Sequence, residues 1–431
     1  MLKTLKNAWA IVELRKKILF TLFIILIYRL GNAVPVPYVD ADLLADYFTS
    51  VNNTILGLWN TMSGGSFSMA TIFALSIQPY INASIIIQLL TIAIPALERL
   101  SKEGGEEGRK KLASITRYTT VGIGLVMGFG YYTLISNGIN GQSMITESGV
   151  WPAIVIIMTF MAGSALIMWM GEQITEFGVG NGISVILFAS IVARFPSSVG
   201  TMVSNVTSGD LAWWALLLVL IGALIIIVLI VIVNDAERRL PVQYSKRVVG
   251  RKLYGGQSTH LPLKVNMSGV MPIIFASTIA AIPATICAFV PSWQDSWVME
   301  HIFNTNTVPY AIIYFLLIIF FSYFYSTIQF NPVEIANNLK KQGGFIPGFR
   351  PGKPTVDFIK KVLNKVTMFG AIYLSIVAVV PMLIGCFTDA PALSGISLGG
   401  TSIIIVVGVA IETVRAIEAQ MLMRNYKGFL D

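Results

Sequence analysis

Residues 71–97, TIFALSIQPYINASIIIQLLTIAIPAL, form an apolar run long enough to cross a lipid bilayer, which takes about 20 such residues. Polar groups at membrane depth are costly unless they face protein or water. We therefore predict a helix that faces water rather than lipid tails on one side. Ile77, Ile81 and Ile85 lie on one face of this helix because they recur four residues apart. The run carries four polar side chains: Gln78, Asn82, Ser84 and Gln88.

The first part of this run has a partial echo in the second half of the chain. The hexapeptide Pro79-Tyr-Ile-Asn-Ala-Ser84 returns at 272–277 as Pro-Ile-Ile-Phe-Ala-Ser, with Pro, Ile, Ala and Ser in register. A match this short between apolar helices also arises by chance, so it is weak support. Two such helices, one per half, are what a pore between two related halves would need.

The composition indicates a membrane protein. The chain has 431 residues, of which 55% are hydrophobic and 12% charged, and its mean hydropathy is +0.73; soluble proteins carry about 25% charged residues. We expect no cleavable signal peptide, since the first residues are too polar and the first apolar run lacks a cleavage site. Cys287, Cys386, His260 and His301 are widely separated, so we expect neither a disulfide, a metal site nor a cofactor.

Ten apolar runs qualify as membrane spans, and all but two of the 30 Lys and Arg residues lie between alternate spans or at the chain ends. The exceptions are Arg29 and Arg194, which fall within spans. The predicted spans are 18–34, 70–97, 117–136, 152–170, 182–204, 211–233, 266–290, 308–329, 365–386 and 397–415. The positive-inside rule then places both termini in the cytoplasm.

Five spans precede residue 205 and five follow residue 210. An odd number of spans per half gives the halves opposite orientations, as in inverted repeats whose functional path lies between the halves. We therefore predict an all-α polytopic membrane protein with ten transmembrane helices in two inverted five-helix halves, 1–205 and 206–431, around a central pore.

The segment 55–66 is apolar but too short to cross, and Ser63-Gly64-Gly65-Ser66 interrupts it. A Gly-Gly pair breaks a helix and supplies a hinge. One interpretation is a half-helix that folds back into the membrane from outside, where protein or water must cover its backbone. The other is an amphipathic helix lying on the outer leaflet.

Two inner loops, 234–264 and 331–363, are larger and more basic than topology requires. The first alternates like a strand around Pro241–Tyr244 and Arg247–Tyr254, and the second is rich in Gly and Pro. Basic loops are usually no more than topology signals. Here we expect projections that bind an acidic partner such as RNA, an acidic protein face or anionic lipid.

No catalytic or nucleotide-binding motif is present, and Glu98, Asp235 and Glu412 all fall at the predicted inner ends of spans. A proton-coupled or sodium-coupled carrier usually keeps an ionisable group near the midplane. A passive channel is therefore favoured, and a secondary transporter of a small solute remains the alternative because inverted repeats fit it equally well. A scaffold without an aqueous path is a weaker possibility.

The sequence closely resembles the SecY family, the channel subunit of the bacterial Sec protein translocon. The resemblance runs through nearly the whole chain and rests on five stretches: 72–90 (IFALSIQPYINASIIIQLL), 166–184 (LIMWMGEQITEFGVGNGIS), 257–277 (QSTHLPLKVNMSGVMPIIFAS), 330–352 (FNPVEIANNLKKQGGFIPGFRPG) and 399–407 (GGTSIIIVV). It implies a non-enzymatic channel that passes unfolded secretory proteins and releases apolar segments sideways into lipid.

The resemblance also implies site residues. An apolar waist would comprise Ile77, Ile81, Ile183, Leu187, Ile274 and Ile405, with Leu187 where the family often has Ile. The 55–66 segment matches the family's plug, with Leu58, Trp59, Met62, Gly64 and Gly65. The second and seventh spans match the lateral gate, flanked by the third and eighth, with candidate polar residues Gln78, Asn82, Ser84 and Ser277.

The same resemblance implies partners and location. The two basic loops match docking sites for the ribosome and the SecA ATPase, through Arg350 and, in the other loop, Arg247, Arg251 and Lys252. SecE would clamp the halves from the side, and SecG would join them. The substrates would be unfolded secretory or membrane proteins, and the site of action the cell membrane with its lipid.

Overall fold

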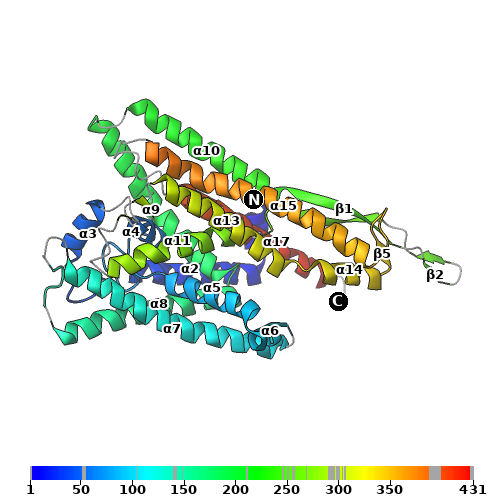
Figure 1. Ribbon diagram of the computed structural model, residues 1–431, viewed down its shortest axis with the longest axis horizontal. Coiled ribbons are helices and arrows are strands. Elements are labelled where there is room, and N and C mark those ends of the chain that lie inside the picture. The colour runs from blue at the N-terminus through cyan, green and yellow to red at the C-terminus, as the bar shows by residue number, and fades with distance from the viewer. Residues whose placement is uncertain are drawn as a thin grey trace.

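The structure is a computed structural model of the chain, and it describes most of the sequence. The described residues are 2–50, 55–102, 104–138, 143–147, 149–209, 212–244, 247–249, 252–254, 258–267, 269–289, 297, 301–302, 304, 307–387 and 399–427. Long helices packed side by side make up most of this part, and strands gather at one end (Figure 1).

Each predicted span corresponds to a helix. In the first half these helices are α2 (Val12–Gly31), α5 (Gln78–Ala93), α7 (Gly105–Asn137), α8 (Val150–Phe177) and α9 (Gly182–Thr207). In the second half they are α10 (Trp213–Asp235), α11 (Met271–Phe289), α13 (Val308–Gln329), α15 (Lys353–Phe387) and α17 (Gly399–Lys427). The shorter helices are α1 (Leu2–Ala10), α3 (Ala41–Ser50), α4 (Ile55–Met62), α6 (Pro95–Lys102) and α14 (Pro332–Lys341).

Length and composition alone support fewer spans than ten. Of the described helices, seven are long and apolar enough to cross a membrane, and α5 with α6 makes an eighth if the bent pair is one span. Helix α2 carries Glu13, Arg15, Lys16 and Lys17 in its first two turns, and α11 is a shorter apolar helix by the same measure. These two helices therefore depend on packing, rather than on apolar length alone, for their place in the bundle.

The second span differs from the predicted uninterrupted helix over 70–97. Residues 72–77 form turns, and α5 begins only at Gln78, with Pro79 in its first turn. Proline suits this position because it lacks the N–H that a first turn leaves unpaired. At the other end Ile94 is extended (φ −108°, ψ 113°), as expected for a residue before proline. Helix α6 then departs at 105°.

Several helices run beyond the predicted spans at their basic inner ends. Helix α15 starts at Lys353 rather than at 365, and α7 starts at Gly105 rather than at 117. Since a charged amphipathic stretch is helical in water as well as at a membrane surface, these helices continue past the apolar run. Asn181 opens α9 as an N-cap, accepting hydrogen bonds from the backbone N–H groups of Ile183 and Ser184.

Helices pack in the same order in each half of the chain. In the first half α5 packs on α7, α7 on α8 and α8 on α9; in the second, α11 packs on α13, α13 on α15 and α15 on α17. The halves meet along two seams, α9 with α10 and α17 on one side, and α5 and α7 with α11 on the other. A single cluster of buried apolar side chains continues across both halves.

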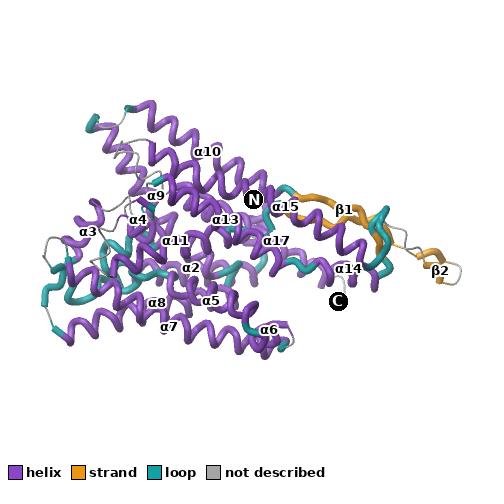
Figure 2. The backbone as a smooth tube through the Cα atoms, viewed as in Figure 1, coloured by secondary structure: helices purple, strands orange, loops and turns teal. Residues whose placement is uncertain are grey.

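The strands belong to the two basic inner loops. Strands β1 (Glu237–Tyr244) and β4 (Ser258–Lys264) pair antiparallel, and β2 (Arg247–Val249) pairs with β3 (Lys252–Tyr254). The strand prediction for loop 234–264 is confirmed. Strand β5 (Gly344–Phe345), from the other loop, adds to the opposite edge of β1. The three strands and α14 project from the same end of the bundle (Figure 2).

Helix α8 approaches the turn segment 72–77 closely at Gly163. A Cβ atom on Gly163 would lie 2.0 Å from the carbonyl oxygen of Ile72. We expect Gly163→Ala to destabilise the protein by about 1–3 kcal/mol, because the backbone of this segment would have to move. Thermal unfolding of the purified protein measures the change. Gly122→Ala on α7 is the control, since nothing lies within 4 Å of a Cβ there; equal effects of both changes would contradict this contact.

Candidate pore, plug and lateral gate

Five of the six predicted waist residues are buried in the one apolar cluster. They come from helices of both halves: α5 and α9 in the first, α11 and α17 in the second. They are Ile81, Leu187, Ile274 and Ile405, together with Ile77 at the residue that precedes α5. Aliphatic side chains offer no polar atoms to a solute or an ion, so this region of the cluster has no chemistry for specific binding.

Ile183, the sixth predicted waist residue, is placed differently. It is only partly buried and packs at the margin of the cluster. Its Cγ1 atom lies 3.1 Å from the position that a Cβ on Gly171 of α8 would occupy. Ile183 therefore packs at the contact between α9 and α8, within the first half of the chain.

The predicted plug begins as helix α4, and its described apolar side chains, Trp59 and Met62, are buried in the same cluster. Trp59 packs edge-on against Phe67, with ring centroids 5.9 Å apart, and Met62 is 5% exposed. The amide Nε2 of Gln78 donates a hydrogen bond to the sulfur of Met62 at 3.4 Å. The side chain of Leu58 lies outside the described residues. Of the two interpretations of this segment, the burial of Trp59 and Met62 favours the half-helix that folds back into the membrane. It argues against an amphipathic helix on the outer leaflet.

The chain reverses after α4 at two glycines in the left-handed region, Gly64 (φ 72°) and Gly65 (φ 92°). A Cβ on Gly64 would lie 2.9 Å from the carbonyl oxygen of Ser190 on α9. Tyr28 of α2 holds Ser190 from the other side, with 2.6 Å between the two hydroxyl oxygens. The turn is therefore seated on α9 through a backbone contact that only glycine allows.

Sequence reasoning missed the tyrosine that covers the chain after the plug. Tyr131 of α7 donates a hydrogen bond to the carbonyl oxygen of Phe67. Its ring also stacks on Phe67, with centroids 4.4 Å apart, and lies 4.9 Å from Phe160. A tyrosine within an apolar span was the available signal, since a buried hydroxyl needs a partner.

None of the hydrogen bonds described for the four candidate gate residues joins α5 to α11. Gln78 bonds to Met62, and Asn82 donates to the sulfur of Met127 on α7 at 3.6 Å. Ser84 accepts from Gln88 of its own helix, and the hydroxyl of Ser277 donates to the carbonyl oxygen of Ile274. Helices α5 and α7 do contact α11. The role of these four residues in gating stays a prediction.

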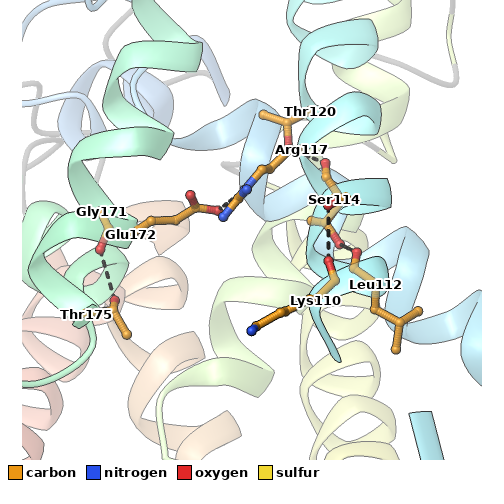
Figure 3. Close-up of polar contacts among 9 residues, drawn as sticks. Lys110, Leu112, Ser114, Arg117, Thr120, Gly171, Glu172 and Thr175 are labelled. Carbon is orange, nitrogen blue, oxygen red and sulfur yellow. Dashed lines mark hydrogen bonds and ion pairs between the residues drawn. The ribbon is translucent and has the colours of Figure 1, made fainter. Parts of the chain in front are cut away.

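An ion pair fastens the helices of the first half near one end of α7. The guanidinium Nε of Arg117 lies 2.8 Å from the carboxylate Oε1 of Glu172 on α8 (Figure 3). Tyr80 of α5 is close enough to interact electrostatically with both charges. Because the Arg117 side chain is 51% exposed, such a pair contributes about 0–1 kcal/mol to stability. The pair therefore links α7 to α8 locally and adds little to the stability of their packing.

The two predicted docking loops form one unit. Gln243 and Tyr244 of β1 pair with Phe345 and Gly344 of β5. A small apolar core beneath the sheet joins both loops to α14 and α15; it consists of Val242, Ala336, Leu339, Ile346 and Ile359. Arg350 is exposed, and its carbonyl oxygen accepts a hydrogen bond from Thr355 at 2.8 Å. Arg251 and the side chains of Arg247 and Lys252 lie outside the described residues.

Comparison with known proteins identifies relatives along the whole chain. The sequence profile of the SecY family matches residues 71–414. The chain is 44% identical to the protein translocase subunit SecY of Streptomyces coelicolor over 444 residues, covering 100% of both chains. It is 41% identical to the SecY subunit of Aquifex aeolicus, again over 100% of both, and 40% identical to that of Thermus thermophilus over 100% of this chain and 98% of the relative.

Solved structures share the fold at lower identity. A structure described as that of a protein-conducting channel superposes with a TM-score of 0.67 at 16% identity, covering 94% of this chain and 92% of that one. A second structure, from work on how the plug domain of SecY stabilises the closed channel, superposes with a TM-score of 0.65 at 15% identity and the same coverage. The Sec61 chain of a canine ribosome-channel complex gives 0.63 at 15% identity, also covering 94% and 92%.

The seating of the glycine turn on α9 has a measurable consequence. We expect Gly65→Ala to cost about 1–2 kcal/mol, because it places an L side chain in the left-handed region. Gly64→Ala should cost more, by about 1–3 kcal/mol, because it adds the clash with Ser190 whereas nothing lies within 4 Å of a Cβ on Gly65. Thermal unfolding of the two variants decides; a smaller loss for Gly64→Ala would show that the turn does not rest on α9.

Proposed function

Because the chain belongs to the SecY family and so forms the protein-conducting channel of a Sec translocon, we propose that unfolded polypeptides cross the membrane between its two halves. The observation that carries this proposal is the continuous apolar cluster to which α5, α9, α11 and α17 all contribute. Membership of this family rules out the alternative of a small-solute transporter. The channel is not an enzyme, and the work of transport comes from its partners.

The waist acts as a seal that is indifferent to sequence. A ring of aliphatic side chains excludes water when it is empty, and so blocks ions without a binding site. The same side chains change rotamer around a passing chain, because they hold it by no specific bond. Ile77, Ile81, Leu187, Ile274 and Ile405 supply this seal, and Ile183 supports it from the contact between α9 and α8.

The plug supports the seal from outside. Helix α4 and its turn fill the space between α9 and the start of α5, held by the Gln78–Met62 hydrogen bond and the contact of Gly64 with Ser190. The buried side chains of Trp59 and Met62 add apolar packing to these two contacts, and apolar packing is non-directional. A polypeptide that enters the channel therefore displaces the plug without breaking a strong interaction.

Apolar segments leave between α5 and α11. This seam joins the two halves, whereas the opposite seam contains the short connection from α9 to α10 and works as the hinge. A signal sequence has about 7–15 apolar residues in its core. Transfer of its side chains to lipid gains about 0.8 kcal/mol for each buried CH₂ group. This partitioning drives release without another energy source.

The basic cytosolic unit receives the partners. Its sheet joins both loops, so a ribosome or the SecA ATPase that binds one loop also holds the other. Arg350 projects from this unit and offers a guanidinium fork to carboxylates or phosphates. SecE clamps the two halves from the side and SecG accompanies it. The multi-pass chain lies in the plasma membrane with both termini in the cytoplasm.

The seal is tested by removing side chains from two helices at once. We expect the variant with Ile81→Gly and Ile274→Gly, or a deletion of residues 57–66, to raise the ion conductance of empty channels reconstituted in planar bilayers, because water then fills the waist. Ile92→Gly is the control: Ile92 lies on α5 but is 54% exposed, so it should leave the conductance unchanged. An unchanged conductance in the double variant would count against the waist.

Arg350 is tested by reversing its charge. We expect Arg350→Glu to lower SecA-driven translocation into vesicles by about tenfold or more, because disrupting an interfacial charge pair costs about 2–5 kcal/mol. The protein should remain inserted and folded, since the Arg350 side chain is exposed. Lys360→Glu, an exposed position on α15, makes the same change of charge and should have a smaller effect. Normal secretion with Arg350→Glu would refute the docking role.

A further inference from the structure

A small polar cavity lies where the segment leading into α11 crosses α13 and α15. Residues 265–267 form one wall, and Ser322 and Ser326 of α13 with Thr367 and Gly370 of α15 form the others. The segment approaches α15 so closely that a Cβ on Gly370 would lie 2.6 Å from the carbonyl oxygen of Val265. The cavity has room for about one water molecule.

Two polar atoms of the lining residues are buried with no hydrogen-bond partner: Oδ1 of Asn266 and Oγ of Ser322. Both residues are deeply buried, with 7% and 1% of their surface exposed. The other two hydroxyls are paired with each other, Ser326 Oγ and Thr367 Oγ1 at 2.9 Å. A buried polar atom without a partner loses its hydration and gains nothing in return, so such atoms are rare in folded proteins.

The cavity lies at the end of a chain of polar contacts that crosses the second half. Nδ2 of Asn266 donates to Oδ1 of Asn234, at the end of α10, at 2.8 Å. Arg415 of α17 donates to the carbonyl oxygen of Asn234 at 2.9 Å and to the carboxylate of Asp235 at 2.6 Å. These contacts fix the amide of Asn266, with its oxygen left unpaired.

We propose that one ordered water molecule occupies this cavity and donates hydrogen bonds to Asn266 Oδ1 and Ser322 Oγ. A buried water typically makes two to four hydrogen bonds to groups that are otherwise unpaired. The Ser326–Thr367 hydroxyl pair on the same wall offers a further partner. With the water in place, polar contacts run without a break from α17 and α10 through the segment before α11 to α13.

This water links the sheet of the two basic loops to α11, a helix of the proposed lateral gate. Strand β4 ends at Lys264, the cavity wall is 265–267, and α11 begins at Met271. The water holds this short connection against α13, so a force on the sheet moves α11 and α13 together. The link to gating rests on the proposed function; the water itself does not.

The sign of one stability change tests the proposal. If the cavity is dry, Ser322→Ala removes an unpaired buried hydroxyl and raises the melting temperature of the full chain in its translocon complex. If a water bridges Ser322 and Asn266, the same change removes a partner of that water and lowers the melting temperature. We expect the lower value. An unchanged or higher melting temperature overturns the proposal.

Ser375→Ala is the matched control. Ser375 is also buried where α15 faces α13, but its hydroxyl has protein acceptors: the carbonyl oxygen of Ala371 in its own helix at 2.7 Å and that of Phe315 on α13 at 3.4 Å. We expect the Ser322→Ala loss to exceed the Ser375→Ala loss; the reverse order counts against the water.

If the Ser322→Ala variant fails to fold, direct observation of the cavity decides. A structure of the wild-type complex at a resolution that shows ordered waters should contain density in this cavity, within hydrogen-bond distance of Asn266 Oδ1 and Ser322 Oγ. An empty cavity overturns the proposal. A melting temperature that rises when sodium replaces potassium at constant ionic strength would assign the cavity to a cation instead, and this result also overturns the water.

Discussion

In a bilayer, every backbone N–H and C=O group needs a partner within the protein, because lipid offers none. Most of this chain meets that requirement by forming helices. The segment between α4 and α5 does not, and it meets the requirement in another way. Tyr131 binds the carbonyl oxygen of Phe67, and Asn60 Oδ1 accepts from the backbone N–H of Ser68 at 3.0 Å. Backbone groups supply further partners, both in turns within the segment and across to residues 34–36. A non-helical stretch can lie in the membrane region because these backbone bonds and the neighbouring side chains together complete its hydrogen bonds.

That requirement explains where the plug and the waist lie relative to each other. The whole segment between α4 and α5 must be covered by protein on all sides. Helices α7, α8 and α9 close around it, at Tyr131, Gly163 and Ser190. Helix α5 then starts late, at Gln78, and Ile77 becomes the residue that joins the turns to the helix. The same contacts therefore bury both the plug and the first residue of the waist. We propose that a plug attached in this way leaves its site without unfolding any membrane-spanning helix.

The two halves are joined unequally, and this inequality is what makes a channel possible. Along one seam α9 packs on α17 and continues into α10 through a short connection. Along the other, α11 meets α5 and α7 through apolar side chains, and the polar residues of α5 bond within their own half. A seam closed by apolar contacts opens toward lipid at little cost, because lipid tails replace those contacts. The second seam is therefore the one along which we propose that the two halves separate.

The sequence by itself determined the class of the protein, the ten helical segments and the strands of loop 234–264. These follow from hydropathy, charge and side-chain period, which act over neighbouring residues. It did not determine the late start of α5, the packing of Ile183 against α8, or the hydrogen bonds of Gln78 and Asn82 to methionine sulfur. Only the tertiary structure decided these, since each depends on which distant backbone or side chain fills the adjacent space. It likewise brought together β1 and β5, and Asn266 and Ser322, because pairing across such separations leaves no periodic pattern in the chain.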